Sequence, residues 1–282
     1  MRPTLPAVLL LALLSGCGSG AGPVEDPQRT PAAGAYDGPM TLPQRFDTAD
    51  VTKRGGAAVR ALECATEPAA GGGGNYDTGP ESLQDDAEAA LRDFLDAEAA
   101  FYAVPDSGYA QERDDGDRVL WSYDVGGRSI VTIVVHDAVA DLEGRRGWGV
   151  ESWAACDPAD LPEQVTAELG LEVWSTADGT RVPTSQVRSA AGPEHCDWQS
   201  VKFLRVGEWP RERLFLRDPD AVLADVADGS WSARAALPAR ARDTGWQREG
   251  RELWLTPEAA YVGTRADGFE RWPAADSGVA CA

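Results

Sequence analysis

The sequence has few of the residues that carry most enzyme chemistry. It contains two His, and only two of its 26 basic residues are Lys. His136 and His195 lie far apart in the chain, which favours structural roles over a catalytic pair. Nucleophile-elbow, zinc-protease, phosphate-loop and Ser-x-x-Lys motifs are all missing. The sequence therefore predicts no catalytic residue, no metal site and no cofactor.

Basic clusters are also missing. The chain has 46 acidic residues and a net charge of −20. Binding to nucleic acid needs clustered Lys and Arg that release counterions, so nucleic acid is excluded as a partner. The acidic runs Asp114–Asp117 and Asp218–Asp220 lack the spacing of a calcium loop and read as turns.

One apolar run, Leu5–Leu14, follows Arg2 near the N-terminus. Ten residues are too few to cross a bilayer core of about 30 Å as a helix. A positive residue, a short apolar run and then small residues make up a secretory signal peptide. We expect residues 1–16 to be that signal peptide.

The signal ends in Leu14-Ser15-Gly16-Cys17. These four residues resemble the lipobox of bacterial lipoproteins. The resemblance implies that Cys17 receives a diacylglyceryl group and becomes the mature N-terminus, with acyl chains such as palmitate holding it at the membrane. It predicts a lipid-anchored protein on the extracytoplasmic face of the cell membrane. Residues 17–41, rich in Gly, Pro and Ala, are expected to form a disordered tether.

Four cysteines remain once Cys17 is set aside as the anchor: Cys64, Cys156, Cys196 and Cys281. An even number suits an oxidising compartment, and no CxxC pair points to redox chemistry or structural zinc. Four cysteines allow three disulfide connectivities. We predict Cys64–Cys156 and Cys196–Cys281, because each pair then lies within one unit of the chain.

The first folded unit is expected over residues 42–188. An amphipathic helix is predicted from Ser82, the expected N-cap, to just before Pro105. Strands are predicted at 118–125, 128–136 and 147–156, with Gly126-Gly127 as a two-residue hairpin turn. A helix on a curled antiparallel sheet is an α+β arrangement, loosely resembling cystatin-like or NTF2-like folds.

The second unit is expected over residues 189–282, with a boundary between Val182 and Pro193 where Pro, Gly and Ser gather. Short strands at 201–206, 213–217, 251–256, 260–264 and 269–272 predict a small antiparallel β unit. It holds six of the ten Trp, which favours core packing over a carbohydrate-stacking face. The six are Trp198, Trp209, Trp231, Trp246, Trp254 and Trp272.

Several short segments of this second unit form a pattern that resembles a known module. They begin with Glu194–Ser200 and Phe215–Pro219 and continue through Gly250–Leu255, Ala259–Val262 and Glu270–Pro273 before a terminal Cys. They resemble a C-terminal module of uncharacterised actinobacterial lipoproteins and secreted proteins. The resemblance covers roughly the last third of the chain and implies no activity.

Two functions fit these observations. The first is a non-enzymatic binding or interaction protein of the cell envelope, with a protein or envelope glycan as partner. The alternative is a hydrolase that acts on envelope polymers through two carboxylates. A cleft with two facing carboxylates and a raised pKa would favour the hydrolase, and an apolar binding patch would favour the binding protein.

Overall fold

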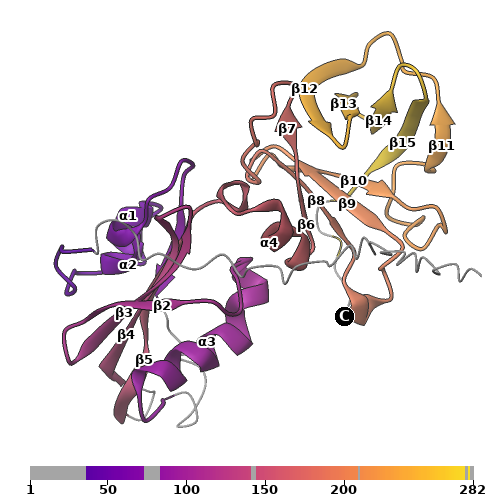
Figure 1. Cartoon of the computed structure of the whole chain (residues 1–282). Coiled ribbons are helices and arrows are strands. Elements are labelled where there is room, and N and C mark those ends of the chain that lie inside the picture. The colour runs from indigo at the N-terminus through magenta and orange to yellow at the C-terminus, as the bar shows by residue number, and fades with distance from the viewer. Residues whose placement is uncertain (1–35, 73–82, 141–143, 209, 277–278, 280–282) are drawn as a thin grey trace, which may run out of the picture.

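A computed structural model of the chain describes residues 36–72, 83–140, 144–208, 210–276 and 279. Two units follow one another along the chain, each built on its own antiparallel sheet (Figure 1). The first sheet has five strands and the second has ten. Helix α4 (Glu163–Glu168) lies on the segment that connects them (Figure 1).

The first sheet has a fully antiparallel order. From one edge to the other its strands are β1 (Ala69–Gly72), β5 (Arg146–Ala155), β4 (Arg128–Ala140), β3 (Arg118–Val125) and β2 (Ala110–Asp114). The predicted hairpin turn is confirmed, because Val125 pairs with Arg128 across Gly126-Gly127. Both glycines have positive φ, at 60° and 79°, which a residue with a Cβ rarely adopts.

Helices cover both faces of this sheet, which explains why β4 is apolar on both faces. Val131, Ile133 and Val135 pack in one cluster with Leu91 and Phe94 of helix α3 (Ala87–Tyr102). On the other face, residues of β3, β4 and β5 pack against helix α2 (Gly56–Ala61), which follows the short helix α1 (Val51–Arg54). Burying both faces removes apolar area from water on each side of β4, so it occupies the centre.

Helix α3 begins four residues later than predicted, because its N-cap is Asp86 and not Ser82. Its N-cap is Asp86, whose carboxylate accepts a hydrogen bond of 2.8 Å from the Ala89 amide. Ser82, the predicted cap, lies outside the described residues. The helix ends at Ala103, in the left-handed conformation with φ 54°, and Pro105 follows. This C-terminal turn aims the chain toward the pocket described below.

The second sheet curls into a near-barrel. Its hydrogen-bonded path is β6 (Leu171–Val173), β8 (Val187–Ala191), β9 (Lys202–Val206), β10 (Arg213–Arg217), β15 (Gly268–Ala275), β14 (Ala259–Thr264), β13 (Arg251–Leu255), β12 (Arg242–Arg248) and β7 (Ser175–Thr176). Strand β11 (Ser232–Ala235) also pairs with β15. The two ends of this path, β6 and β7, are consecutive in the chain and meet at Trp174.

Trp174 is therefore the residue at which the barrel closes. It is 2% exposed, and its indole N–H donates to the Ser189 hydroxyl at 3.2 Å. Its ring belongs to the barrel core together with Leu204, Phe215 and Trp272, all nearly inaccessible. A bent strand that pairs at both of its ends leaves few open edges in the sheet.

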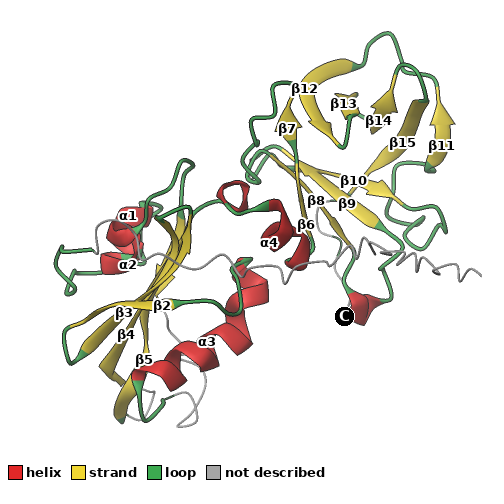
Figure 2. Cartoon of the chain, viewed as in Figure 1, coloured by secondary structure: helices red, strands yellow, loops and turns green. Residues whose placement is uncertain are grey.

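The expected α+β fold class is wrong: the described residues form a mostly β protein. They contain fifteen strands and four α-helices, of which three have six residues or fewer (Figure 2). The second sheet is the larger one, not a small appended unit. The misassignment arises because short strands such as β1, with the sequence AAGG, carry no alternating pattern and form only through tertiary pairing.

The change from one sheet to the other comes earlier than the expected boundary. Strands β6, β7 and β8, at 171–191, pair within the second sheet, so a boundary at 188/189 cuts through β8. The predicted Cys64–Cys156 disulfide is confirmed and joins residues 92 positions apart. Cys196 is also disulfide-bonded, whereas Cys281 lies outside the described residues, so the pairing of Cys196 with Cys281 stays a prediction.

Candidate functional site

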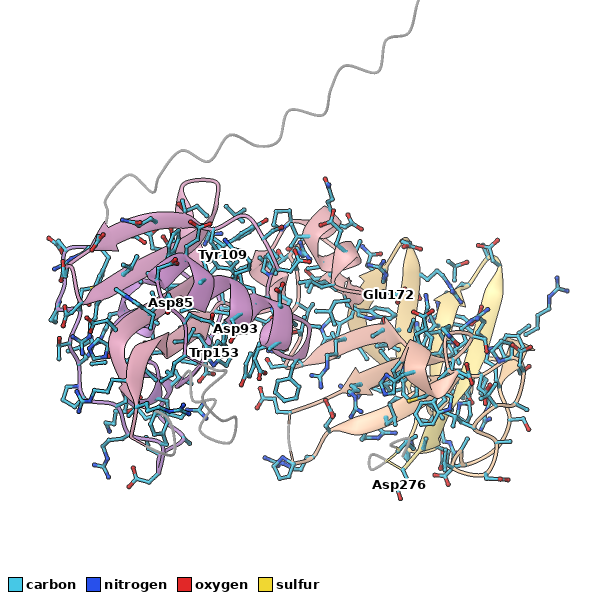
Figure 3. The ribbon with its side chains drawn as sticks, turned by 90° about the horizontal axis from the view of Figure 1, so that it is seen from below. Asp85, Asp93, Tyr109, Trp153, Glu172 and Asp276 are labelled. Atoms are coloured by element: carbon cyan, nitrogen blue, oxygen red, sulfur yellow. A yellow bond between two sulfur atoms is a disulfide. The ribbon has the colours of Figure 1, made fainter. Side chains whose placement is uncertain are left out.

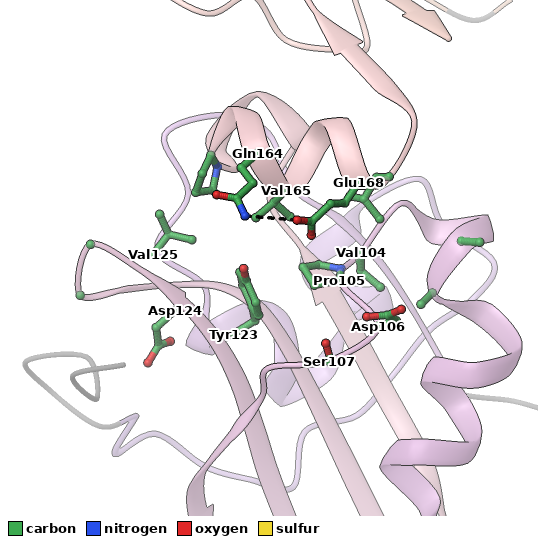
Figure 4. A pocket seen from close by; sticks show the side chains of 16 residues that line it. Val104, Pro105, Asp106, Ser107, Tyr123, Asp124, Val125, Gln164, Val165 and Glu168 are labelled. Atoms are coloured by element: carbon green, nitrogen blue, oxygen red, sulfur yellow. Dashed lines mark hydrogen bonds between the residues drawn. The ribbon is translucent and has the colours of Figure 1, made fainter. Parts of the chain in front are cut away.

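A pocket of about 790 Å³ opens beside the C-terminal end of α3. Its walls come from three places in the chain: the end of α3 with the loop 104–107, the β3–β4 turn at 123–127, and α4 with its flanks at 162–169 (Figure 4). A volume of this size suits a small-molecule site. The pocket therefore joins elements of the first unit to the segment that leads into the second.

Local backbone chemistry places each wall. The left-handed Ala103 and the following Pro105 turn the chain out of α3, and the Tyr109 hydroxyl donates to the Pro105 carbonyl at 3.0 Å. Gly126 and Gly127 make the tight turn on the opposite side. Arg181 holds α4 in place: its guanidinium donates to the Leu161 carbonyl and lies 3.4 Å from the Thr166 hydroxyl.

The lining is apolar with acidic groups and contains no basic side chain. Tyr123 stands in the pocket with its hydroxyl toward α4, where the Gln164 amide donates to Glu168 at 3.3 Å (Figure 4). Asp106 and Asp124 lie on opposite sides of Tyr123 in this view (Figure 4). Apolar contact comes from the partly or fully buried Val104, Pro105, Val125, Val165 and Leu169.

This arrangement selects by charge. Asp106 and Glu168 lie in a lining that contains no Lys, Arg or His, whereas the Asp124 carboxylate accepts from the Ser129 hydroxyl at 3.0 Å and points away from Tyr123 (Figure 4). The negative charge of Asp106 and Glu168 repels an anion and attracts a cation. The pocket thus fits a ligand with an apolar body and a neutral or positive head.

The carboxyl groups with raised pKa lie outside this lining. Burial, followed by the charge of Asp96, raises the pKa of Asp93 on α3. Burial is also the main cause that raises the pKa of Glu112 on β2, and nearby acids add to it. Glu112 accepts a 2.6 Å hydrogen bond from the amide of Tyr36, the first described residue. Neither carboxyl group is placed to act on a ligand in the pocket.

His136 belongs to a charged cluster on the first sheet. Its Nδ1 lies 3.0 Å from Glu151 Oε2, and Arg118, directly opposite on β3, donates to the same oxygen at 2.8 Å. Its Nε2 faces the carboxylates of Asp117 and Asp137, each at 3.9 Å. A histidine base activates a hydroxyl or thiol nucleophile by removing its proton, and these two neighbours are neither. The cluster fits a structural role, as the sequence indicates. His195 is exposed in a short 3-10 turn before Cys196.

The described Trp residues of the second unit pack as core residues, as expected. Trp272 is 2% exposed, and Trp231 and Trp246 pack against the same barrel core. Trp198 and Trp254 pack in two smaller clusters. Trp209 lies outside the described residues. Side chains already packed on one face leave little ring area for stacking a sugar.

Sequence reasoning missed the pocket. Of its walls, only the turn signals at Pro105 and Gly126-Gly127 are visible in the sequence. Their approach to α4 depends on the tertiary arrangement. Cys17, the proposed lipidation site, lies outside the described residues.

No protein-family model, curated protein or solved structure matches this chain. Within the described residues, no helix has the length and apolar character needed to cross a membrane. The same residues contain no group of three or more His, Cys, Asp or Glu side chains that could hold a metal ion. Function must therefore be argued from the pocket itself.

Proposed function

We propose that this protein is a lipid-anchored extracytoplasmic binding protein that takes a small amphipathic ligand in the pocket between α3 and α4. The lipobox ending in Cys17 supports the anchor. The Cys64–Cys156 disulfide supports an oxidising compartment, where such bonds persist. The observation that carries the binding role is a pocket of about 790 Å³ that combines apolar walls with the carboxylates of Asp106 and Glu168 and no basic group.

The chemistry of the lining defines the ligand class. Burying an alkyl chain gains about 0.8 kcal/mol per CH₂ group, which supplies affinity for an apolar body. A primary or quaternary ammonium head then pairs with Glu168 or Asp106, and it can also lie against the Tyr123 ring. We favour binding over hydrolysis of an envelope polymer because the carboxyl groups with raised pKa, Asp93 and Glu112, lie outside the pocket.

A matched ligand series tests the pocket. Hexylamine, hexanol and hexanoate share one alkyl chain and differ in head charge. In calorimetric titrations of the full chain we expect hexylamine to bind most tightly and hexanoate most weakly. Glu168→Gln should weaken hexylamine by roughly three- to tenfold and leave hexanol unchanged, because only the charge term is lost.

Glu88→Gln is the matched control for this series. Glu88 lies on α3 with its side chain 70% exposed, outside the pocket lining. Equal affinities for amine and carboxylate, or an equal effect of both Gln variants, would contradict the proposed ligand class.

The anchor is tested separately. Cys17→Ala should release the protein from membranes or leave it as a larger unprocessed precursor. Unchanged fractionation together with unchanged electrophoretic mobility would refute lipidation and would leave the pocket proposal standing.

A further inference from the structure

A ring of charged side chains faces into one end of the barrel. On six strands, a charged residue lies two positions from a residue of the barrel core and therefore points to the same side. The core residues are Trp174, Leu204, Phe215, Trp246, Leu253 and Trp272. Their charged neighbours are, in the same order, Glu172, Lys202, Arg217, Arg248, Arg251 and Glu270. Glu172 lies on the side of the barrel toward the first unit (Figure 3).

Like charges stand directly opposite one another twice in this ring. Arg217 on β10 pairs across the strands with Lys202 on β9. Arg248 on β12 pairs with Arg251 on β13. Opposed like charges destabilise a sheet, so two such pairs at one end of a barrel are a local conflict. Conflicts of this kind are expected at functional sites.

Two carboxylates neutralise only part of this charge. Glu172 accepts from Lys202 at 2.5 Å and lies 3.7 Å from Arg248. Glu270 lies 3.0 Å from Arg217 and 3.1 Å from Arg251. Each carboxylate thus bridges two cations, and four cations face two anions.

A further acid beside the ring, Glu249, compensates weakly. Glu249 lies 3.1 Å from Arg248, but its side chain is 71% exposed. An exposed ion pair contributes about 0–1 kcal/mol. A local excess of positive charge therefore remains in a chain whose net charge is −20.

The four cations are restrained but still reach solvent. Their side chains are 38%, 32%, 21% and 37% exposed for Lys202, Arg217, Arg248 and Arg251. Arg217 lies 5.4 Å from the centre of the Trp231 ring, and Arg251 donates to the Val262 carbonyl at 3.0 Å. Side chains already ordered by such contacts lose little entropy when they bind an anion.

We propose that this end of the barrel binds a doubly charged oxyanion group, a phosphate or a sulfate, between the Arg217–Lys202 pair and the Arg248–Arg251 pair. Guanidinium groups donate paired hydrogen bonds that match the geometry of phosphate oxygens. A dianion supplies the charge that Glu172 and Glu270 leave unbalanced, and it relieves both like-charge pairs. This site is separate from the acidic pocket, so the two select ligands of opposite charge.

Titration of the full chain with inorganic phosphate, and with sulfate, tests the site at constant ionic strength. We expect saturable binding, together with a rise in the thermal unfolding temperature as phosphate is added. Arg251→Gln should weaken binding by at least about tenfold, because one charge-assisted hydrogen-bond donor is lost. Glu270→Gln should strengthen binding, which gives a result of opposite sign if the Arg variant folds poorly.

Arg240→Gln is the charge-matched control. Arg240 is 70% exposed, pairs with Glu258 and lies outside the ring. Absence of binding at millimolar phosphate and sulfate, or an equal loss with Arg240→Gln and Arg251→Gln, would overturn the proposal. A second arm uses vesicles with and without phosphatidic acid. Retention only by the acidic vesicles, lost in Arg251→Gln, would assign the phosphate to a lipid headgroup instead of a free solute.

Discussion

Asp157 is the residue whose replacement should most directly test how the two units are joined. It follows β5 and Cys156 and is 9% exposed. Its Oδ1 accepts from the amides of Ala159 and Thr184, both at 2.8 Å. Its Oδ2 accepts from the Thr184 hydroxyl at 3.0 Å and from the Ser185 amide at 3.3 Å. One carboxylate thus ties the end of the first sheet to the segment that enters β8 of the second.

The expected cost follows from these four bonds. A hydrogen bond to a charged group contributes about 1.5–3 kcal/mol net, and a buried donor left without a partner costs about 1–3 kcal/mol. Water can hydrate some of the N–H and O–H donors that lose Asp157, and the energies of the four hydrogen bonds are not independent. We therefore expect Asp157→Ala to lower the free energy of unfolding by about 3–5 kcal/mol. Asp157→Asn keeps one acceptor oxygen and should cost less, about 1–3 kcal/mol.

Urea denaturation followed by Trp fluorescence measures this cost, because Trp residues lie in both units. A transition that is single in the wild type and splits in two in Asp157→Ala would show that this carboxylate couples the units. Asp96→Asn, an exposed change on α3, serves as the control. A loss below about 1 kcal/mol for Asp157→Ala, equal to that control, would refute the reasoning.

Two further predictions concern the first unit and the remaining cysteines. Replacing Cys64 and Cys156 by Ser together should lower the free energy of unfolding by about 4–5 kcal/mol, because the disulfide closes a loop of 92 positions. A midpoint of urea denaturation close to that of the wild type would contradict this. Non-reducing peptide mapping should find Cys196 linked to Cys281. Glu112→Gln should stabilise the fold at about pH 7 and have no effect near pH 4, as thermal unfolding across this range would show. Burial raises the folded-state pKa of Glu112 above the ordinary value for a glutamate side chain, so its ionisation as pH rises through that folded pKa costs stability in the wild type. A Gln variant less stable than the wild type at neutral pH would refute this sign.

Parts of the fold are readable from the sequence because they rest on local chemistry. Gly126-Gly127 requires the positive φ of a tight hairpin turn, so that turn was predictable at the residue level. The strand predicted at 118–125 coincides with β3 (Arg118–Val125). The Cys64–Cys156 pairing was one of three connectivities, favoured because both residues flank one unit.

The barrel could not be predicted in the same way. Its closing strands β6 and β7 contain three and two residues, too few to show alternation. Trp174 between them reads in the sequence as one more aromatic residue, and only its position in the core shows that it closes the sheet. The α+β expectation failed for this reason. It was based on one helix with a periodic sequence and missed short strands that form only by pairing with other strands.

The sequence by itself determined the local hairpin turn, and it is the source of the proposed lipid anchor. The lipobox-like residues, the apolar run before them and the even number of remaining cysteines are properties of neighbouring residues or of composition, and they need no fold to be recognised. Tertiary structure alone decided both candidate sites. The pocket brings together Asp106, Asp124 and Glu168 from three segments, and the barrel ring brings together charges from six strands. Each of these residues looks in sequence like one solvent-exposed charge among 72, because a charged cluster is defined by distances in space and by the desolvation that the fold imposes.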